Sequence, residues 1–403
     1  MTISYCSQKK RKNRERQIQL ENLIRVTEEL IIDNIDPNHI LVEILTDLKS
    51  ELEDLRENQM NGLLIRAKAQ WIESGEKPTK YFCNLEKHQS PTPIILMAYF
   101  RSGSSFVGDI IQAHEGVFYL FEPLRSHTTR FKLLNHTSPQ SISRFRNKTE
   151  SIQTHLSRCE LNKVPSGILR DMFLNRSKKA RQYNLCIHDH ANKKYDHKKT
   201  CLQKLLQSCM GSEVMLIKVI RLSFSILLKL LETIPKLKVI YLQRDPRAMA
   251  RARVHFGMIR KKTEIEDVTN FCYRLNDDAK VAEKIKQKYP ERIMSLFYEE
   301  VAYHPVIEAQ RIYKFAGLKF GRRQEDIITA MTTTPTPEKE CRKMCTTKVS
   351  SKQAEEWRKT TPLKFVHVVD QCCRQYYQRI GYKDIPNLHL LQDLHFKLRF
   401  PHT

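Results

Sequence analysis

Residues 93–106 read Pro-Ile-Ile-Leu-Met-Ala-Tyr-Phe-Arg-Ser-Gly-Ser-Ser-Phe. The first part is a continuous apolar run, which is typical of a strand buried on both faces. The second part predicts a turn into a helix, whose first amides lack partners inside the helix and carry the positive end of its dipole. A basic, serine-rich turn at that point suits a bound phosphate, although a strand-to-helix turn without a ligand has the same pattern. The second glycine and the Gly-Lys pair of the Walker sequence are absent, which disfavours a nucleotide triphosphatase or a nucleotide kinase.

A second β-rich run lies far along the chain and ends in Arg-Asp-Pro-Arg. Residues 237–248 read Leu-Lys-Val-Ile-Tyr-Leu-Gln-Arg-Asp-Pro-Arg-Ala. With these two motifs the chain resembles the carbohydrate sulfotransferases. These are Golgi enzymes that move a sulfuryl group from 3′-phosphoadenosine 5′-phosphosulfate (PAPS) to a sugar hydroxyl. The resemblance covers about residues 91–386 and includes the stretches 117–124, 217–222, 297–300 and 381–382.

The resemblance implies a donor site. In that family Tyr-Arg-Ser-Gly-Ser-Ser-Phe holds the 5′-phosphosulfate, and Arg-Asp-Pro-Arg-Ala opens the segment that holds the 3′-phosphate. We therefore expect PAPS to contact Arg101, Ser102, Gly103, Ser104, Ser105, Phe106, Arg244 and Arg253. Arg101 is expected at the bridging oxygen and the 5′-phosphate. Ala252 stands where the family has serine, which puts one hydrogen bond to the 3′-phosphate in question. For Arg247, the sequence is equally consistent with a surface salt bridge and with a contact to the ligand.

Glu122 is the candidate general base. It ends the β-like run 117–121 and follows Arg101 by 21 residues, a separation that a helix and a strand can return to the same edge of a sheet. Ligands of open α/β sheets bind at that edge. The tyrosylprotein sulfotransferases, which the Arg-Ser-Gly turn also resembles, have a catalytic glutamate in a similar place. The alternative is that Glu122 pairs with Arg101 or caps the turn before Pro123.

The order of the elements predicts the fold class. Further β-like runs occur at residues 214–220, 238–243 and 292–298, and residues 264–289 have helical periodicity. Strands that alternate with helices favour an α/β protein, with a parallel sheet and helices on both faces. The resemblance implies the P-loop-like sulfotransferase fold. We divide the chain into an α-helical segment (1–90), a PAPS-dependent sulfotransferase domain (91–386) and a C-terminal tail (387–403).

The first segment has a different character. Residues 18–64 place apolar side chains at helical spacing, with a break at Asp36-Pro37, and predict two amphipathic helices that offer a surface for self-association. Residues 65–87 resemble the connector between the endonuclease and the reverse transcriptase of non-LTR retrotransposon polyproteins. Only that connector matches, and nothing downstream resembles a polymerase palm. The match therefore indicates a fusion, or an erroneous joining of exons, rather than an activity.

Localisation and redox state follow from two further patterns. The basic cluster at residues 9–12 is not followed by an apolar run, so no signal peptide or signal anchor is predicted. The most apolar stretch, 214–231, contains three basic residues and does not qualify as a membrane span. The resemblance implies the Golgi, but relatives carry an N-terminal anchor and this sequence departs from that pattern. Candidate lumenal disulfides join Cys201 with Cys209, or Cys341 with Cys345, and reduced core thiols explain these cysteines equally well.

The formal net charge of +24 belongs to the chain after residue 90, because residues 1–90 are close to neutral. A strongly basic domain indicates an anionic partner. With the resemblance, this predicts a transferase with PAPS as donor, a glycan or glycosaminoglycan as acceptor, and no metal. The expected position is the 6-hydroxyl of galactose, N-acetylglucosamine or N-acetylgalactosamine. The alternative is a catalytically impaired relative or a retrotransposon-derived nucleic-acid-binding protein. Nucleic acid is disfavoured because the retrotransposon-like part is the neutral part and no nucleic-acid-binding module is visible.

Overall fold

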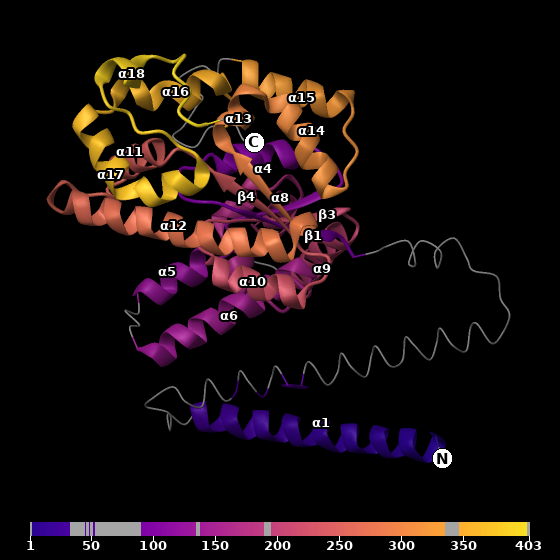
Figure 1. Cartoon of the computed structure of the whole chain (residues 1–403). Helices are drawn as coiled ribbons and strands as arrows, with labels where there is room; N and C mark the ends of the chain where they lie inside the picture. Colours follow the sequence, from indigo (N-terminus) through magenta and orange to yellow (C-terminus); the bar gives the residue numbers. More distant parts are fainter. Residues whose placement is uncertain are drawn as a thin grey trace. The chain divides into compact units, whose positions relative to one another are not determined.

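The computed structural model describes residues 2–32, 45, 48, 51–52, 90–133, 138–188, 195–334 and 346–400 (Figure 1). The chain forms two compact units, residues 1–87 and 88–403. The connector-like stretch 65–87 and the candidate pair Cys341 and Cys345 lie outside the described residues.

The first unit contains the helix α1, Thr2–Ile32. Leu20 on this helix and Leu52 are buried, and Arg16 forms an ion pair of 2.8 Å with Glu51. This confirms an N-terminal helix. The second of the two predicted helices falls largely outside the described residues, and self-association through residues 18–64 stays a prediction.

A five-stranded parallel sheet forms the centre of the second unit. Its strands are β1 (Thr92–Met97), β2 (Val117–Phe121), β3 (Val214–Val219), β4 (Lys238–Gln243) and β5 (Ile293–Phe297). Their order is β2-β3-β1-β4-β5, and every neighbouring pair is parallel. All five lie where continuous apolar runs predict them. The expected α/β fold with a parallel sheet is confirmed.

Helices cover both faces of this sheet (Figure 1). They are α4 (Ser104–Ile111), α5 (Arg125–Leu133), α6 (Pro139–Ser157), α7 (Ser166–Leu169), α8 (Lys178–His188), α9 (Tyr195–Met210), α10 (Phe224–Thr233), α11 (Pro246–His255), α12 (Glu264–Lys288), α13 (Tyr298–Tyr303), α14 (Pro305–Ala316), α15 (Arg322–Thr333), α16 (Ser350–Thr360), α17 (Leu363–Ile380) and α18 (Leu388–Gln392). Short 3-10 helices are η1 (Met172–Arg176), η2 (Lys261–Thr263) and η3 (Pro290–Arg292).

Two apolar clusters form because successive strand residues point to opposite faces. Ile95 and Met97 belong to one cluster, which α6, α10, α12 and α17 cover. Ile94 and Leu96 belong to the other, which α4, α14 and α15 cover. A strand covered on both faces must be apolar at every position, which explains the unbroken run at residues 93–97.

The segment after residue 386 is packed within the second unit although its sequence carries no clear signal. Leu391 is fully buried, and it shares a small apolar cluster with Trp357 and Ile385. Arg358 on α16, itself buried, donates hydrogen bonds to the main-chain carbonyls of Leu390, Leu391, Asp393 and Phe396. One buried guanidinium thus binds a series of main-chain carbonyl groups of this segment.

Three disulfides join described cysteines: Cys159–Cys209, Cys186–Cys201 and Cys272–Cys373. The predicted pairing of Cys201 with Cys209 is wrong. Both residues lie on α9, eight positions apart, which corresponds to about 12 Å along a helix and exceeds the reach of a disulfide. Each instead pairs with a cysteine of another segment. No helix in the described part of the chain is long and apolar enough to cross a membrane.

Candidate active site

The turn after β1 is built around Arg101 and Gly103. Both have left-handed backbone angles, with φ of 69° and 87°. Gly103 precedes the first turn of α4, and a Cβ atom there would lie 2.1 Å from the ring of Tyr298. Only glycine satisfies both the backbone angle and this close approach. The glycine of the Arg-Ser-Gly-Ser-Ser motif is therefore a structural requirement of the turn.

The serines of this turn have different tasks. Ser102 is buried, and its hydroxyl donates to the carbonyl of Tyr99 at 2.8 Å and accepts from the amide of Tyr99 at 3.3 Å. It closes the turn on itself and does not line a pocket. Ser104 and Ser105 form the first turn of α4, followed by Phe106. The amides of a first helical turn point outward and attract anions.

A pocket with a cavity volume of about 160 Å³ lies at the carboxyl ends of the strands. Among the residues expected from the sequence, it is lined by Arg101, Gly103, Ser104, Ser105, Phe106, Glu122 and Arg244. It is also lined by Tyr99, Phe100, Lys218, Ile220, Tyr298, Thr346, Lys348, Ser350 and Gln353. The structure thus brings both motifs and Glu122 into one site, at the edge where open α/β sheets bind ligands.

Two guanidinium groups meet in this pocket. Arg244 follows β4, donates to the main-chain oxygen of Arg101 at 2.9 Å, and lies over the ring of Tyr298 at 4.2 Å. In the described part of the chain, the Nε atoms of Arg101 and Arg244 are buried without a hydrogen-bond partner. Burial, and then the charge of Arg244, lower the pKa of Arg101. Two partly desolvated cations with unpartnered donors form a site for an anion.

Glu122 lies between two other cations. The chain leaves β2 through this residue with φ of 49°. Its carboxylate accepts a hydrogen bond of 2.5 Å from Lys218 of β3 and another from Arg221. The ammonium of Lys218 lies 4.0 Å from the ring centre of Phe121, and burial lowers its pKa to about 8. The alternative interpretation, in which Glu122 pairs with Arg101, is not observed, because its two oxygens accept from Lys218 and Arg221 instead.

Two predicted residues of the Arg-Asp-Pro-Arg segment lie elsewhere. Arg253 is not among the residues that line the pocket. Its guanidinium lies 4.3 Å from the ring centre of Phe271, and burial lowers its pKa to about 10. Arg247 has no exposed surface and pairs with Asp245 and Asp370. The interpretation of Arg247 as part of a surface salt bridge is therefore wrong.

Several residues of the site were not predicted from the sequence. Lys218 is a charge inside an apolar strand, a pattern that counts against a membrane span and equally signals a buried ion pair. Lys348 reaches the pocket from the segment before α16, where its ammonium donates to Gln353 at 3.0 Å. Thr346 fixes that segment to α4 through a hydrogen bond of 2.6 Å to Asp109. No local pattern marks this segment, because its role depends on where the chain returns.

Comparisons with known proteins show which family the chain resembles. A family model described as sulfotransferase domain matches residues 91–381. Carbohydrate sulfotransferase 3 of Tetronarce californica is 26% identical over 324 residues, which cover 72% of this chain and 72% of that protein. Carbohydrate sulfotransferase 3 of Homo sapiens is 26% identical and covers 72% of this chain and 67% of its own length. Carbohydrate sulfotransferase 1 of Danio rerio is 25% identical, with 76% and 81% covered.

Proposed function

Because this chain belongs to the sulfotransferase domain family, which its residues 91–381 match, we propose that it is a carbohydrate sulfotransferase. It transfers a sulfuryl group from PAPS to a hydroxyl group of a glycan or glycosaminoglycan, at the 6-position of galactose, N-acetylglucosamine or N-acetylgalactosamine. The names of its curated relatives support the carbohydrate acceptor. The observation that carries the proposal is the pair Arg101 and Arg244, two partly buried cations in one pocket whose Nε atoms are buried and have no hydrogen-bond partner.

The donor fits the charges of this pocket. PAPS carries its negative charge at the 3′-phosphate and the 5′-phosphosulfate. In the proposal, Arg101 and the first amides of α4 hold the 5′-phosphosulfate, and Arg244 holds the 3′-phosphate. Arg253 is a further proposed contact to the 3′-phosphate, although it does not line the pocket. Ala252 offers no hydroxyl, so the 3′-phosphate depends on the guanidinium groups.

In the proposed reaction the oxygen of the sugar hydroxyl attacks the sulfur. The bond from sulfur to the bridging oxygen of the 5′-phosphate breaks, and 3′,5′-adenosine diphosphate leaves. Arg101 stabilises the charge that develops on the bridging oxygen, as in phosphoryl transfer. Glu122 takes the proton of the hydroxyl. No metal is required in this scheme, because side chains stabilise the leaving group.

The ammonium of Lys218 pairs with the carboxylate of Glu122 before the reaction, and we propose that it stabilises the charge of the reacting groups once Glu122 has taken the proton. The two cations at Glu122 hold its carboxylate in one orientation. Once Glu122 is protonated, it no longer balances the buried ammonium of Lys218. Lys218 lines the same pocket, so the charge that builds up on the sulfuryl oxygens and the leaving group can replace the lost partner. We therefore propose that Lys218 couples proton removal to sulfuryl transfer.

The disulfides support a lumenal location. Stable disulfides are typical of oxidising compartments, and three of them lie within the second unit. This agrees with the Golgi location that the resemblance implies.

The proposal is tested by comparing two ligands. A sulfotransferase should bind 3′,5′-adenosine diphosphate, and Arg101→Ala or Arg244→Ala should weaken that binding while leaving any affinity for duplex DNA unchanged. A nucleic-acid-binding relic should instead bind DNA, with an affinity that falls steeply as salt is added. Titration of the full chain with each ligand at several salt concentrations separates the two. Tight DNA binding without binding of the nucleotide would overturn the proposed function.

A further inference from the structure

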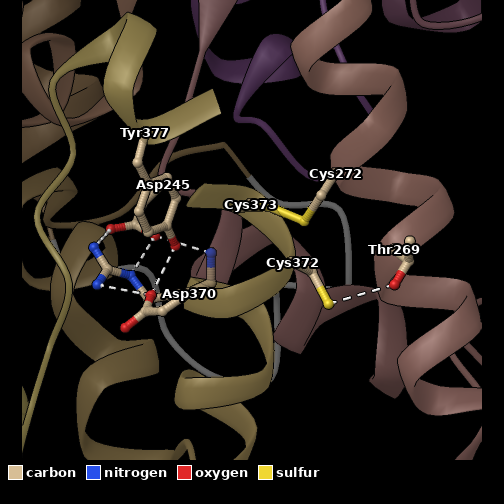
Figure 2. The surroundings of a disulfide bond; sticks show 8 residues. Asp245, Thr269, Cys272, Asp370, Cys372, Cys373 and Tyr377 are labelled. Carbon is tan, nitrogen blue, oxygen red and sulfur yellow. Dashed lines mark hydrogen bonds and ion pairs between the residues drawn. A yellow bond between two sulfur atoms is a disulfide. The ribbon is translucent and has the colours of Figure 1, made fainter. Parts of the chain in front are cut away.

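A buried cluster of four side chains includes Asp245, the residue that follows Arg244 in the chain. It consists of Asp245, Arg247, Asp370 and Tyr377, and we call it the anchor cluster (Figure 2). Arg247 has no exposed surface and donates to both carboxylate oxygens of Asp245, at 2.9 and 2.8 Å. It also donates to Asp370 at 3.3 Å and to the main-chain oxygen of Lys383 at 2.9 Å. A guanidinium with this many partners holds the surrounding segments in one arrangement.

The anchor cluster fixes the turn that carries Arg244. Asp245 is the N-cap of α11 and accepts from the amide of Arg247 at 2.9 Å. Its own amide donates to the carboxylate of Glu299 at 2.9 Å. The residue after Arg244 is thus held on both sides, and the direction in which Arg244 leaves the backbone depends on these bonds.

A disulfide ties the anchor cluster to a second helix. Asp370 lies on α17 and accepts a hydrogen bond of 2.9 Å from the hydroxyl of Tyr377 on the same helix. It also accepts one of 3.0 Å from the amide of Ile385, which lies after the helix. Cys373 lies one turn further along α17 and is bonded to Cys272 of α12 (Figure 2). The position of Asp370, and with it that of Arg247, is therefore linked covalently to α12.

The helix α12 also supports the other half of the proposed donor site. Asp278 on α12 accepts a hydrogen bond of 2.9 Å from Tyr99, two residues before Arg101. Phe271, next to Cys272, lies beneath the guanidinium of Arg253. One helix thus contacts the Arg-Ser-Gly turn directly and the Arg-Asp-Pro-Arg turn through α17.

We propose that Arg247 and Asp370 are positioning residues for Arg244, and that the disulfide Cys272–Cys373 holds them in register with α12. This inference rests on the proposed function, in which Arg244 contacts the 3′-phosphate of the donor. The disulfide then contributes to donor affinity as well as to stability. The other two disulfides of the described residues involve neither α12 nor α17, because Cys186–Cys201 joins α8 to α9 and Cys159–Cys209 joins the end of α6 to α9.

The matched experiment removes one disulfide at a time from the full chain. Cys372, a free thiol beside Cys373, is replaced in all proteins by Cys372→Ser so that it cannot pair with Cys272. The test variant carries Cys272→Ser and Cys373→Ser, and the control carries Cys186→Ser and Cys201→Ser. Binding of 3′,5′-adenosine diphosphate is measured by calorimetry well below every melting temperature. Hydrogen exchange at residues 244–249 is measured without ligand.

Both disulfide variants should melt at a lower temperature than the parent. Only the Cys272 and Cys373 variant should show faster exchange at residues 244–249 and a dissociation constant raised about tenfold, a change of one decade in affinity. Unchanged exchange at residues 244–249, or an equal change of affinity in both variants, would overturn the positioning role. A parent that binds no 3′,5′-adenosine diphosphate would instead contradict the proposed function, while the exchange result still decides whether the disulfide fixes the turn.

Asp370→Asn gives a second test without loss of a disulfide. The amide keeps the size of the side chain but removes the charge that faces Arg247. We expect weaker binding of 3′,5′-adenosine diphosphate and an unchanged KM for the glycan acceptor. Equal losses for donor and acceptor would indicate a general disturbance of the fold and contradict the specific role.

Discussion

The guanidinium of Arg244 donates a hydrogen bond of 2.9 Å to the main-chain oxygen of Arg101, 143 residues earlier in the chain. The two residues follow the adjacent strands β4 and β1. Two turns that are far apart in sequence therefore form one cationic wall. The Nε atoms of both guanidinium groups are buried without a hydrogen-bond partner, so an anion that enters the pocket supplies acceptors that these donors lack.

The turn should not tolerate a side chain at Gly103. Gly103→Ala forces a left-handed conformation that costs about 1–2 kcal/mol for an L-residue, and its Cβ would meet the ring of Tyr298 at 2.1 Å. We expect loss of binding to 3′,5′-adenosine diphosphate, measured by calorimetry. Gly167→Ala is the control, because a Cβ there meets nothing within 4 Å. Equal affinities of the two variants would contradict this account of the turn.

Removal of the carboxylate at Glu122 should lower the rate of sulfuryl transfer by about 10²–10⁴-fold, which is the usual effect of losing a general base. Glu122→Gln also leaves the buried Lys218 without its charge partner, which destabilises by about 3–5 kcal/mol. Urea unfolding should show much of that stability restored in Glu122→Gln combined with Lys218→Met, while transfer stays low in both. Normal transfer by Glu122→Gln at a temperature where it is folded would exclude Glu122 as the base.

Stability should depend on pH through Glu299. Burial, and then the nearby charge of Asp245, raise the pKa of Glu299 to about 7. The folded state therefore holds a proton that the unfolded state, with a pKa of about 4.3, has released. This contribution is complete below pH about 4.3 and is lost as the pH rises through about 7.

Glu299→Gln should remove that dependence. Between pH 5 and 8, the free energy of unfolding of the parent should fall relative to that of the variant, by about 3 kcal/mol at most. The difference between the two proteins is the quantity to measure, because other titrating groups then cancel. Parallel curves for the two proteins would show that the folded state does not raise the pKa of Glu299.

Deletion of residues 1–90 should leave a folded protein. The first strand begins at Thr92, and the sheet and both of its apolar clusters lie after residue 91. The shortened chain should melt cooperatively and bind 3′,5′-adenosine diphosphate as the full chain does. A gradual melt, or insoluble protein, would show that the N-terminal unit contributes to the fold of the second.

Much of the fold could be predicted from the sequence, because a strand that is buried on both faces must be apolar at nearly every position. Each strand is an apolar run, and Arg101, Arg244 and Glu122 each follow such a run. Once the strands are parallel neighbours, their carboxyl ends bring these residues together. That these three residues meet at one edge of the sheet could therefore be predicted from the order of the motifs.

Other features depend on contacts that no local pattern encodes. The disulfides depend on which helices lie side by side, so Cys209 pairs with Cys159 rather than with Cys201 on its own helix. The packing of the last residues depends on Arg358, which lies more than thirty positions earlier. Lys218 was visible as a charge in an apolar strand, but its partner Glu122 lies 96 positions away.

The most direct test of the central claim is sulfuryl transfer itself. Purified full chain is incubated with PAPS carrying a labelled sulfuryl group and with glycans that end in galactose, N-acetylglucosamine or N-acetylgalactosamine, and labelled glycan is measured. We predict transfer by the parent, and a loss of at least about 10²–10³-fold in Arg101→Ala, because the developing charge loses its nearest cation. Arg323→Ala, which removes an exposed ion pair with Glu115, should transfer normally. Transfer by Arg101→Ala at the rate of the parent would contradict the account.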